Sequence, residues 1–141
     1  MNVLHNVRFR AYSHATEVQS RVESALRFVS GTHELGREVL RGHHGNPLIK
    51  LTAFLKKRKD LDAFLERMEE AGIIPELLTT LDERMDEEGS LYIRFSKQAA
   101  YEGRIEMTEK DDAISTRAKV RAYPANKEEA LKVLTEALLE E

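Results

Sequence analysis

The sequence predicts a two-layer α+β fold, in which an antiparallel or mixed β-sheet has helices packed on one face. Several short segments alternate apolar and polar residues with a period of two, which is typical of half-buried strands. Other segments carry apolar residues at helical spacing, and the two kinds interleave without a tandem repeat. The 141 residues fit a single domain, 1–141, that can bury a core without disulfides.

The N-terminal part is predicted to form a strand followed by a helix. Apolar and polar residues alternate over 7–12, as in a strand with one buried face. Thr16 is the predicted N-cap of a helix whose apolar stripe extends to Val29. Gly31 lies just beyond that stripe and is the predicted helix stop.

The middle of the chain is predicted to hold a hairpin and two helices. Residues 34–41 and 48–55 are predicted strands on either side of a Gly-containing turn at 42–47. A helix with an apolar stripe is predicted over 56–72, and Pro75 fits the first turn of a further helix. These helices are expected to belong to the layer that covers the sheet.

The C-terminal part is predicted to contain further strands and the last helix. Alternation over 91–96 predicts a strand, and residues 97–101 are expected to form a short helical turn. Residues 103–108 are a candidate strand, and 118–123 is the predicted last strand. Asn126 is the predicted cap of the final helix.

Three of the predicted strands share one pattern, with apolar residues on one side and Arg, Lys or Tyr on the other. If these strands lie in one sheet whose apolar face meets the helices, the opposite face carries eight polar side chains. They are Arg8, Arg10, Tyr12, Tyr92, Arg94, Lys119, Arg121 and Tyr123. Arginine neutralises phosphates and stacks on bases, and tyrosine offers a flat stacking surface, so the mixture is typical of RNA recognition. Two other interpretations stay open, namely an ordinary solvated strand face and a face buried in a homodimer.

Charge is segregated along the chain, although the formal net charge is only −3. Residues 1–60 carry eleven Lys and Arg against five Asp and Glu, whereas residues 61–88 carry two against ten. A basic face can therefore coexist with an acidic one. The acidic run at 82–88 lacks the ligand spacing of a calcium loop and is interpreted as a solvated or protein-docking surface.

Two short segments are further candidates for RNA contact. The turn at 42–47 contains His43 and His44, for which a specialised turn, an RNA contact and a metal site are all open interpretations. The metal site is the least favoured, because adjacent side chains on an extended segment point apart and no third ligand is suitably spaced. Lys97 and Gln98 are interpreted either as contacts to phosphate or base edges, or as part of a structural connector.

The sequence contains no positive indication of catalysis. It lacks a glycine-rich phosphate loop, a serine elbow and a paired-carboxylate signature, and it has no cysteine to act as a nucleophile. We therefore expect no catalytic residue, metal or cofactor, and a metal-dependent nuclease using His43 or His44 is the weakest hypothesis. No apolar run approaches the roughly 20 residues of a membrane span, and the cysteine-free composition suits a reducing cytoplasm.

Four sequence strings, taken in order, resemble one known family. They are VRFRAYSHAT at 7–16, GHHGNP at 42–47, LYIRFSKQAAY at 91–101 and VRAYPA at 120–125. Together they resemble the archaeal RNA-binding-domain family described as a predicted exosome subunit. The resemblance covers nearly the whole chain, and it implies a fold similar to that of the large-subunit ribosomal protein that binds 5S RNA. Ser96 departs from the family pattern, which often has an acidic residue there.

The resemblance implies RNA binding connected with the exosome, so RNA and exosome subunits are the expected partners. The leading hypothesis is a non-catalytic RNA-binding protein that is an accessory to exosome-type RNA processing or degradation. The alternative is a protein interaction or assembly factor that forms a homodimer or docks a partner without touching RNA.

Overall fold

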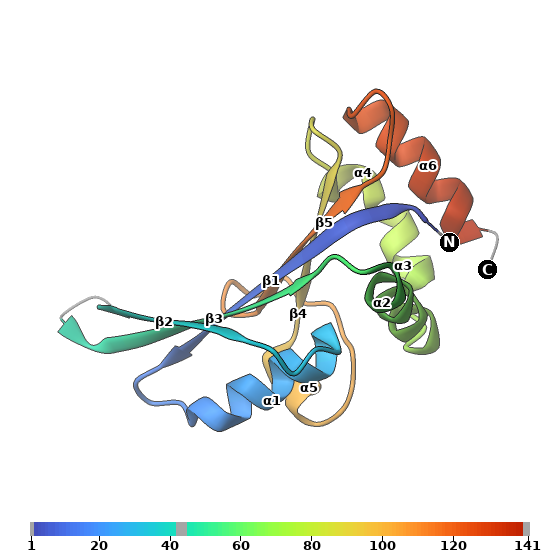
Figure 1. Cartoon of the computed structure of the whole chain (residues 1–141). Helices are drawn as coiled ribbons and strands as arrows, with labels where there is room; N and C mark the ends of the chain where they lie inside the picture. The colour runs from blue at the N-terminus through green and yellow to red at the C-terminus, as the bar shows by residue number, and fades with distance from the viewer. Residues whose placement is uncertain (1, 42–44, 140–141) are drawn as a thin grey trace.

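One antiparallel sheet of five strands runs through the molecule and separates a helical layer from an open face (Figure 1). The computed structural model describes residues 2–41 and 45–139. The strand order is β2-β3-β1-β5-β4, and every neighbouring pair is antiparallel. The strands are β1 (Leu4–His14), β2 (Gly36–Arg41), β3 (Pro47–Leu55), β4 (Ser90–Phe95) and β5 (Ile114–Val120).

The helices form two groups along the sheet (Figure 1). Helices α1 and α5 pack against each other, and α1 also contacts β1 and β3. The second group contacts β1, β4 and β5 near the other end of the sheet. The helices are α1 (Gln19–Ser30), α2 (Arg58–Glu70), α3 (Ile74–Thr79), α4 (Leu81–Arg84), α5 (Lys97–Tyr101) and α6 (Lys127–Leu139). None of the helices described is long and apolar enough to cross a membrane.

Three fully buried phenylalanines connect the helical layer to the sheet. The ring of Phe64, on α2, lies 5.4 Å from that of Phe9 and 6.2 Å from that of Phe95, edge to face in both cases. Edge-to-face pairs at these distances are favourable beyond the burial of their apolar area. Because Phe9 and Phe95 lie on β1 and β4, this contact fixes which face of both strands is turned inward.

The predicted α+β class and helix-covered sheet are confirmed, and so are most of the predicted elements. The hairpin, the helix after it and the short helical segment at 97–101 are present with small shifts of their ends. Gly31 follows α1 in the left-handed conformation, at φ 78°, which glycine adopts without a Cβ penalty. The side chain of Asn126 accepts a hydrogen bond from the N–H of Glu129 at 2.9 Å, as the predicted cap requires.

The predicted helix cap at Thr16 is wrong. Helix α1 begins after Val18, and Thr16 lies in the preceding turn. That turn is held by Glu17 instead, whose N–H donates to the carbonyl of His14 at 2.9 Å. The carboxylate of Glu17 also accepts from the N–H of His14 at 3.0 Å, so the turn satisfies its polar groups without Thr16.

The last strand is displaced from its predicted position. Strand β5 occupies Ile114–Val120 rather than 118–123. The prediction missed the start of the strand because the inward position 116 is a threonine, whose polarity interrupts the apolar alternation. The candidate strand at 103–108 is also wrong. It forms a single bridge between Phe95 and Met107 rather than a continuous ladder.

Candidate functional site

A row of cationic and aromatic side chains crosses four strands on the face away from the helices. Arg8 on β1 is paired with Phe54 on β3 and with Arg117 on β5. Arg117 is paired in turn with Tyr92 on β4. Side chains of directly paired residues project from the same face of a sheet, so these four lie side by side.

A second row follows on the same face. Arg10 is paired with Thr52 on β3 and with Ser115 on β5, and Ser115 is paired with Arg94. Arg10 is therefore flanked by two hydroxyl groups, each of which both donates and accepts hydrogen bonds. We refer to the surface formed by these two rows and the adjoining Lys50 as the outer face.

The outer face is hollowed. A cavity of about 780 Å³, open to solvent, lies over the strands on this side of the sheet. Its floor and walls include the side chains of Arg8, Arg10, Lys50, Thr52, Phe54, Tyr92, Ser115 and Arg117. Residues 34–36, just before and at the start of β2, close one side of it, and Glu34 is the carboxylate among them.

Three arginines of the outer face lie against aromatic rings. The guanidinium carbon of Arg8 is 4.6 Å from the ring centre of Phe54, and that of Arg117 is 5.9 Å from Tyr92. Arg10 lies 5.7 Å from the ring of Tyr12. Such contacts are attractive and limit the orientations of the guanidinium groups. Phe54 and Tyr92 nevertheless remain 45% exposed, so part of each residue is accessible to solvent.

The ring of Tyr92 is also held from its hydroxyl end. Its O–H donates to Oδ2 of Asp86 at 3.1 Å, while Oδ1 accepts from the N–H groups of Ser90 and Glu88 at 2.8 and 3.0 Å. Burial works against the charged form of Asp86, but these hydrogen bonds outweigh it and hold the pKa of the carboxyl below its usual range. Burial and the hydrogen bond to Asp86 raise the pKa of Tyr92.

Four residues predicted from the sequence to bind RNA lie at or beside the cavity, in addition to Arg94 of the second row. Arg8, Arg10 and Tyr92 line the cavity, and Tyr12 lies on the same side of β1, paired with Lys50 of β3. The structure thus joins predictions made on two separate strands. Their role in binding stays a prediction.

Other predicted residues lie at the rim of the sheet or beyond it. The guanidinium of Arg94 donates to the carbonyl of Glu109 at 3.2 Å and lies 3.6 Å from the carboxylate of Asp111. The ammonium of Lys119 donates to a backbone carbonyl, that of Glu88. Arg94 and Lys119 are therefore partly engaged within the protein.

Arg121 and Tyr123 follow the end of β5 and do not belong to the sheet. Arg121 donates from its backbone N–H to the carbonyl of Val3 at 2.7 Å and from its side chain to that of Leu4 at 3.4 Å. Tyr123 is 97% exposed. These two positions are separate from the cavity.

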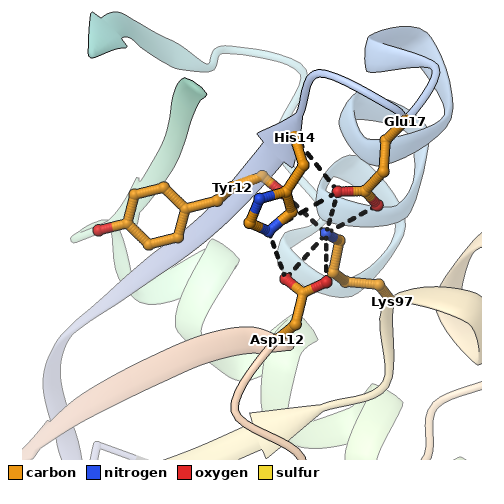
Figure 2. Close-up of polar contacts among 5 residues, drawn as sticks. All are labelled: Tyr12, His14, Glu17, Lys97 and Asp112. Carbon is orange, nitrogen blue, oxygen red and sulfur yellow. Dashed lines mark hydrogen bonds and ion pairs between the residues drawn. The ribbon is translucent and has the colours of Figure 1, made fainter. Parts of the chain in front are cut away.

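Lys97 lies in a different environment, at the first residue of α5 (Figure 2). Its ammonium donates to the carbonyl of Tyr12 at 2.7 Å, to Glu17 at 2.9 Å and to Asp112 at 3.1 Å. The side chain is only 10% exposed. We call the cluster formed by Lys97, Glu17, Asp112 and His14 the lysine clasp. Figure 2 shows the ring of Tyr12 pointing away from this cluster.

The lysine clasp includes the one group of possible metal ligands found among the residues that the structure describes. His14, Glu17 and Asp112 each place a ligand atom within 4.8 Å of the others, and Nε2 of His14 lies 3.3 Å from Asp112. The ammonium of Lys97 already lies between the two carboxylates. The geometry is therefore that of an ion-pair network with an internal cation.

The remaining residues predicted to contact RNA are Gln98, His43 and His44. Gln98 is exposed on α5, where its amide donates to Glu102 at 3.0 Å, away from the cavity. His43 and His44 lie outside the described residues.

Sequence reasoning missed Phe54 and Arg117, the two residues that complete the first row. Phe54 is apolar, yet it alternates with the inward residues Leu51, Ala53 and Leu55, and this period of two could have placed it outward. Arg117 belongs to the part of β5 that was not predicted. Correct ends for β5 would have revealed Arg117.

Two sequence comparisons relate this chain to proteins described as RNA-binding. A family model described as RNA binding matches residues 6–120. The RNA-binding protein PAB1135 of Pyrococcus abyssi (strain GE5 / Orsay) is 34% identical over 145 residues, a match that covers 95% of this chain and 93% of that protein.

Solved structures agree with these sequence matches. A DUF54 protein from Methanothermobacter thermautotrophicus is similar with a TM-score of 0.86 at 34% identity, over 96% of this chain and 98% of that one. A DUF54 protein from Archaeglobus fulgidus is similar with a TM-score of 0.83 at 30% identity, over 94% and 98%. The fold and the sequence thus identify the same group of relatives.

Proposed function

The chain belongs to the RNA-binding family, and we propose that it binds RNA through its outer face without catalysing a reaction. One observation carries this proposal. The guanidinium groups of Arg8, Arg10 and Arg117 come from adjacent strands and line one cavity, each beside an aromatic ring. Arginine offers both charge for phosphate and a plane for bases, which is the combination that RNA recognition uses.

The fold also explains how an acidic chain presents a basic surface. Most of the acidic stretch at 61–88 belongs to α2, α3 and α4, which lie in the helical layer. The outer face is on the other side of the sheet, and its cavity is lined by four cations, the three arginines and Lys50, against the single carboxylate of Glu34. A local excess of positive charge attracts a polyanion even when the net charge is negative.

The chemistry of the cavity supports a role in holding RNA. Guanidinium groups keep their protons at neutral pH, so they donate hydrogen bonds and do not act as acid–base catalysts. The hydroxyls of Thr52 and Ser115 add hydrogen-bonding groups beside Arg10. We therefore assign the cavity to binding and positioning.

Charge-removing variants test this proposal. We expect Arg8→Gln and Arg117→Gln each to weaken RNA binding by roughly tenfold, since a hydrogen bond to a charged group contributes about 1.5 kcal/mol. Fluorescence anisotropy with a labelled RNA measures the effect. Arg58→Gln is the matched control, because Arg58 is an exposed arginine on α2 with a carboxylate, Asp62, at 3.7 Å. Equal losses for all three variants would contradict the assignment to the outer face.

We further propose that the chain presents RNA to exosome-type processing or degradation. The support is the resemblance of the four sequence strings, which also carries the expected likeness to the 5S-RNA-binding ribosomal protein. Co-sedimentation of the purified chain with archaeal exosome subunits, with and without RNA, tests this link. Association that requires RNA would fit an accessory role, whereas no association under either condition would remove it.

A further inference from the structure

We propose that the cavity of the outer face takes unpaired bases, so that the chain selects single-stranded RNA over double-helical RNA. This inference rests on the proposed RNA-binding function and adds the class of RNA. It depends on the arrangement of the rings and guanidinium groups, and not on the excess of positive charge alone.

Accessible rings lie at both ends of the first row. Phe54 on β3 and Tyr92 on β4 are separated by β1 and β5, which is three inter-strand spacings of about 4.8 Å, or about 14 Å in total. Arg8 and Arg117 fill the positions between them. The row therefore offers a stacking surface at each end with two cations in the middle.

An RNA double helix would make little use of these rings. Its bases are stacked on both faces, its major groove is too narrow for side chains, and proteins recognise it by phosphates and 2′-hydroxyls across a shallow minor groove. The bases of a single strand are free to turn outward and stack on aromatic rings or guanidinium planes. Half-exposed rings inside a hollow fit the second mode of binding.

Two further features keep the cavity open and polar. Gly36 on β2 is paired with Thr52, and a Cβ at position 36 would collide with Oγ1 of Thr52, so the missing side chain leaves room beside this hydroxyl. The hydroxyls of Thr52 and Ser115 flank Arg10 within the cavity. They can donate to or accept from the edge of a base that has no pairing partner.

Removing a ring without removing charge tests the inference. The probe is a labelled, unstructured RNA of about ten nucleotides, within the site size of a small binding domain, compared with a blunt duplex of the same length. We expect the single strand to bind more tightly than the duplex. Phe54→Leu and Tyr92→Leu should weaken single-strand binding by about fivefold or more and leave duplex binding nearly unchanged.

Two controls separate stacking from other effects. Tyr101→Leu removes an exposed tyrosine that also lies beside an arginine, Arg21 at 5.3 Å, but outside the cavity, so it should not change binding. Tyr92→Phe keeps the ring and loses the hydroxyl that contacts Asp86, so it should bind like the unmodified chain. If Tyr92→Leu impairs folding, as circular dichroism would show, Phe54→Leu decides the result alone.

The outcomes are distinct. Tighter single-strand binding that depends on the two rings supports the inference. Equal or tighter binding of the duplex, or single-strand binding that persists in Phe54→Leu, overturns it while leaving the proposed RNA-binding function in place. Binding of neither RNA at low salt contradicts the proposed function as well.

Discussion

At the scale of single residues, Lys97 shows how one charge holds three segments together. Its ammonium contacts the end of β1, the turn before α1 and the loop before β5, through Tyr12, Glu17 and Asp112. The first two segments adjoin each other near the N-terminus, whereas the loop before β5 lies far along the chain, yet all three meet around one cation (Figure 2). Of the two interpretations of Lys97, the geometry favours the structural connector.

We expect Lys97→Ala to lower the free energy of unfolding by about 1–2 kcal/mol. The substitution leaves two carboxylates facing each other and a carbonyl without its donor, while partial access to water limits the cost. Urea denaturation measures the change. Gln98→Ala is the control from the next position, where an exposed side chain should contribute less than about 0.5 kcal/mol. Equal stabilities of the two variants would show that the clasp is not stabilising.

The lowered pKa of Asp86 predicts that the free energy of unfolding depends on pH. Its pKa is lowered in the folded state, because its hydrogen bonds outweigh the opposing effect of burial. The resulting stabilisation is present above the unfolded pKa of about 4 and is lost as the pH falls through the lower folded value. Asp86→Asn should therefore lose less stability than the unmodified chain when urea denaturation is repeated at about pH 3 instead of about pH 6. A parallel loss in both proteins would contradict this assignment.

At the scale of elements, the end of α1 depends on an arginine from α2. Arg67 donates from Nε to the carbonyl of Val29 at 3.2 Å and from Nη2 to that of Ser30 at 2.7 Å. The last carbonyls of a helix lack intrahelical donors, so this side chain completes the C-terminus of α1. Gly31 gives it room, because an added Cβ would lie 2.6 Å from the guanidinium.

We expect Gly31→Ala to destabilise the fold more than Gly72→Ala does. Both glycines have positive φ, near 78° and 74°, so each substitution carries a conformational cost of about 1 kcal/mol. At Gly72 an added Cβ meets no described atom within 4 Å, whereas at Gly31 it displaces Arg67. The difference, about 1–2 kcal/mol, is the cost of the lost hydrogen bonds and is measured by thermal or urea unfolding. Equal effects would mean that Arg67 adjusts freely.

Local patterns predicted most elements, and the errors occur where tertiary contacts override those patterns. The alternation in β1 is complete over 7–12 and predicted its outward arginines correctly. In β5 the buried Thr116 obscured the inward face, so the strand was placed too late and Arg117 was missed. Thr16 is a good cap by composition, but Glu17 provides the contacts that shape this turn.

At the scale of the whole molecule, the site depends on strand order, which no local pattern contains. Strand β5 lies between β1 and β4, although β4 precedes β5 in the sequence. This order places Arg117 beside Arg8 and brings Tyr92 to the end of the same row. Sequence patterning therefore predicted part of the outer face, whereas the complete row appears only when the sheet is assembled.

The salt dependence of RNA binding should reflect the number of outer-face cations that neutralise a phosphate. If Arg8, Arg10 and Arg117 each neutralise one phosphate of a single strand, the logarithm of the association constant should fall with the logarithm of salt concentration with a slope of about −2. Anisotropy titrations over a range of salt concentrations measure this slope. It should become shallower by about 0.7 for each arginine replaced by glutamine.

Arg58→Gln should leave the slope unchanged, because Arg58 is on α2 in the helical layer. A slope that is insensitive to all three outer-face substitutions would mean that the phosphates lie elsewhere on the molecule. Substitution of the rings Phe54 and Tyr92 should lower affinity without changing the slope, since stacking releases no condensed counterions. The slope thus reports the contribution of the arginines, whereas a loss of affinity without a change in slope reports the contribution of the rings of Phe54 and Tyr92.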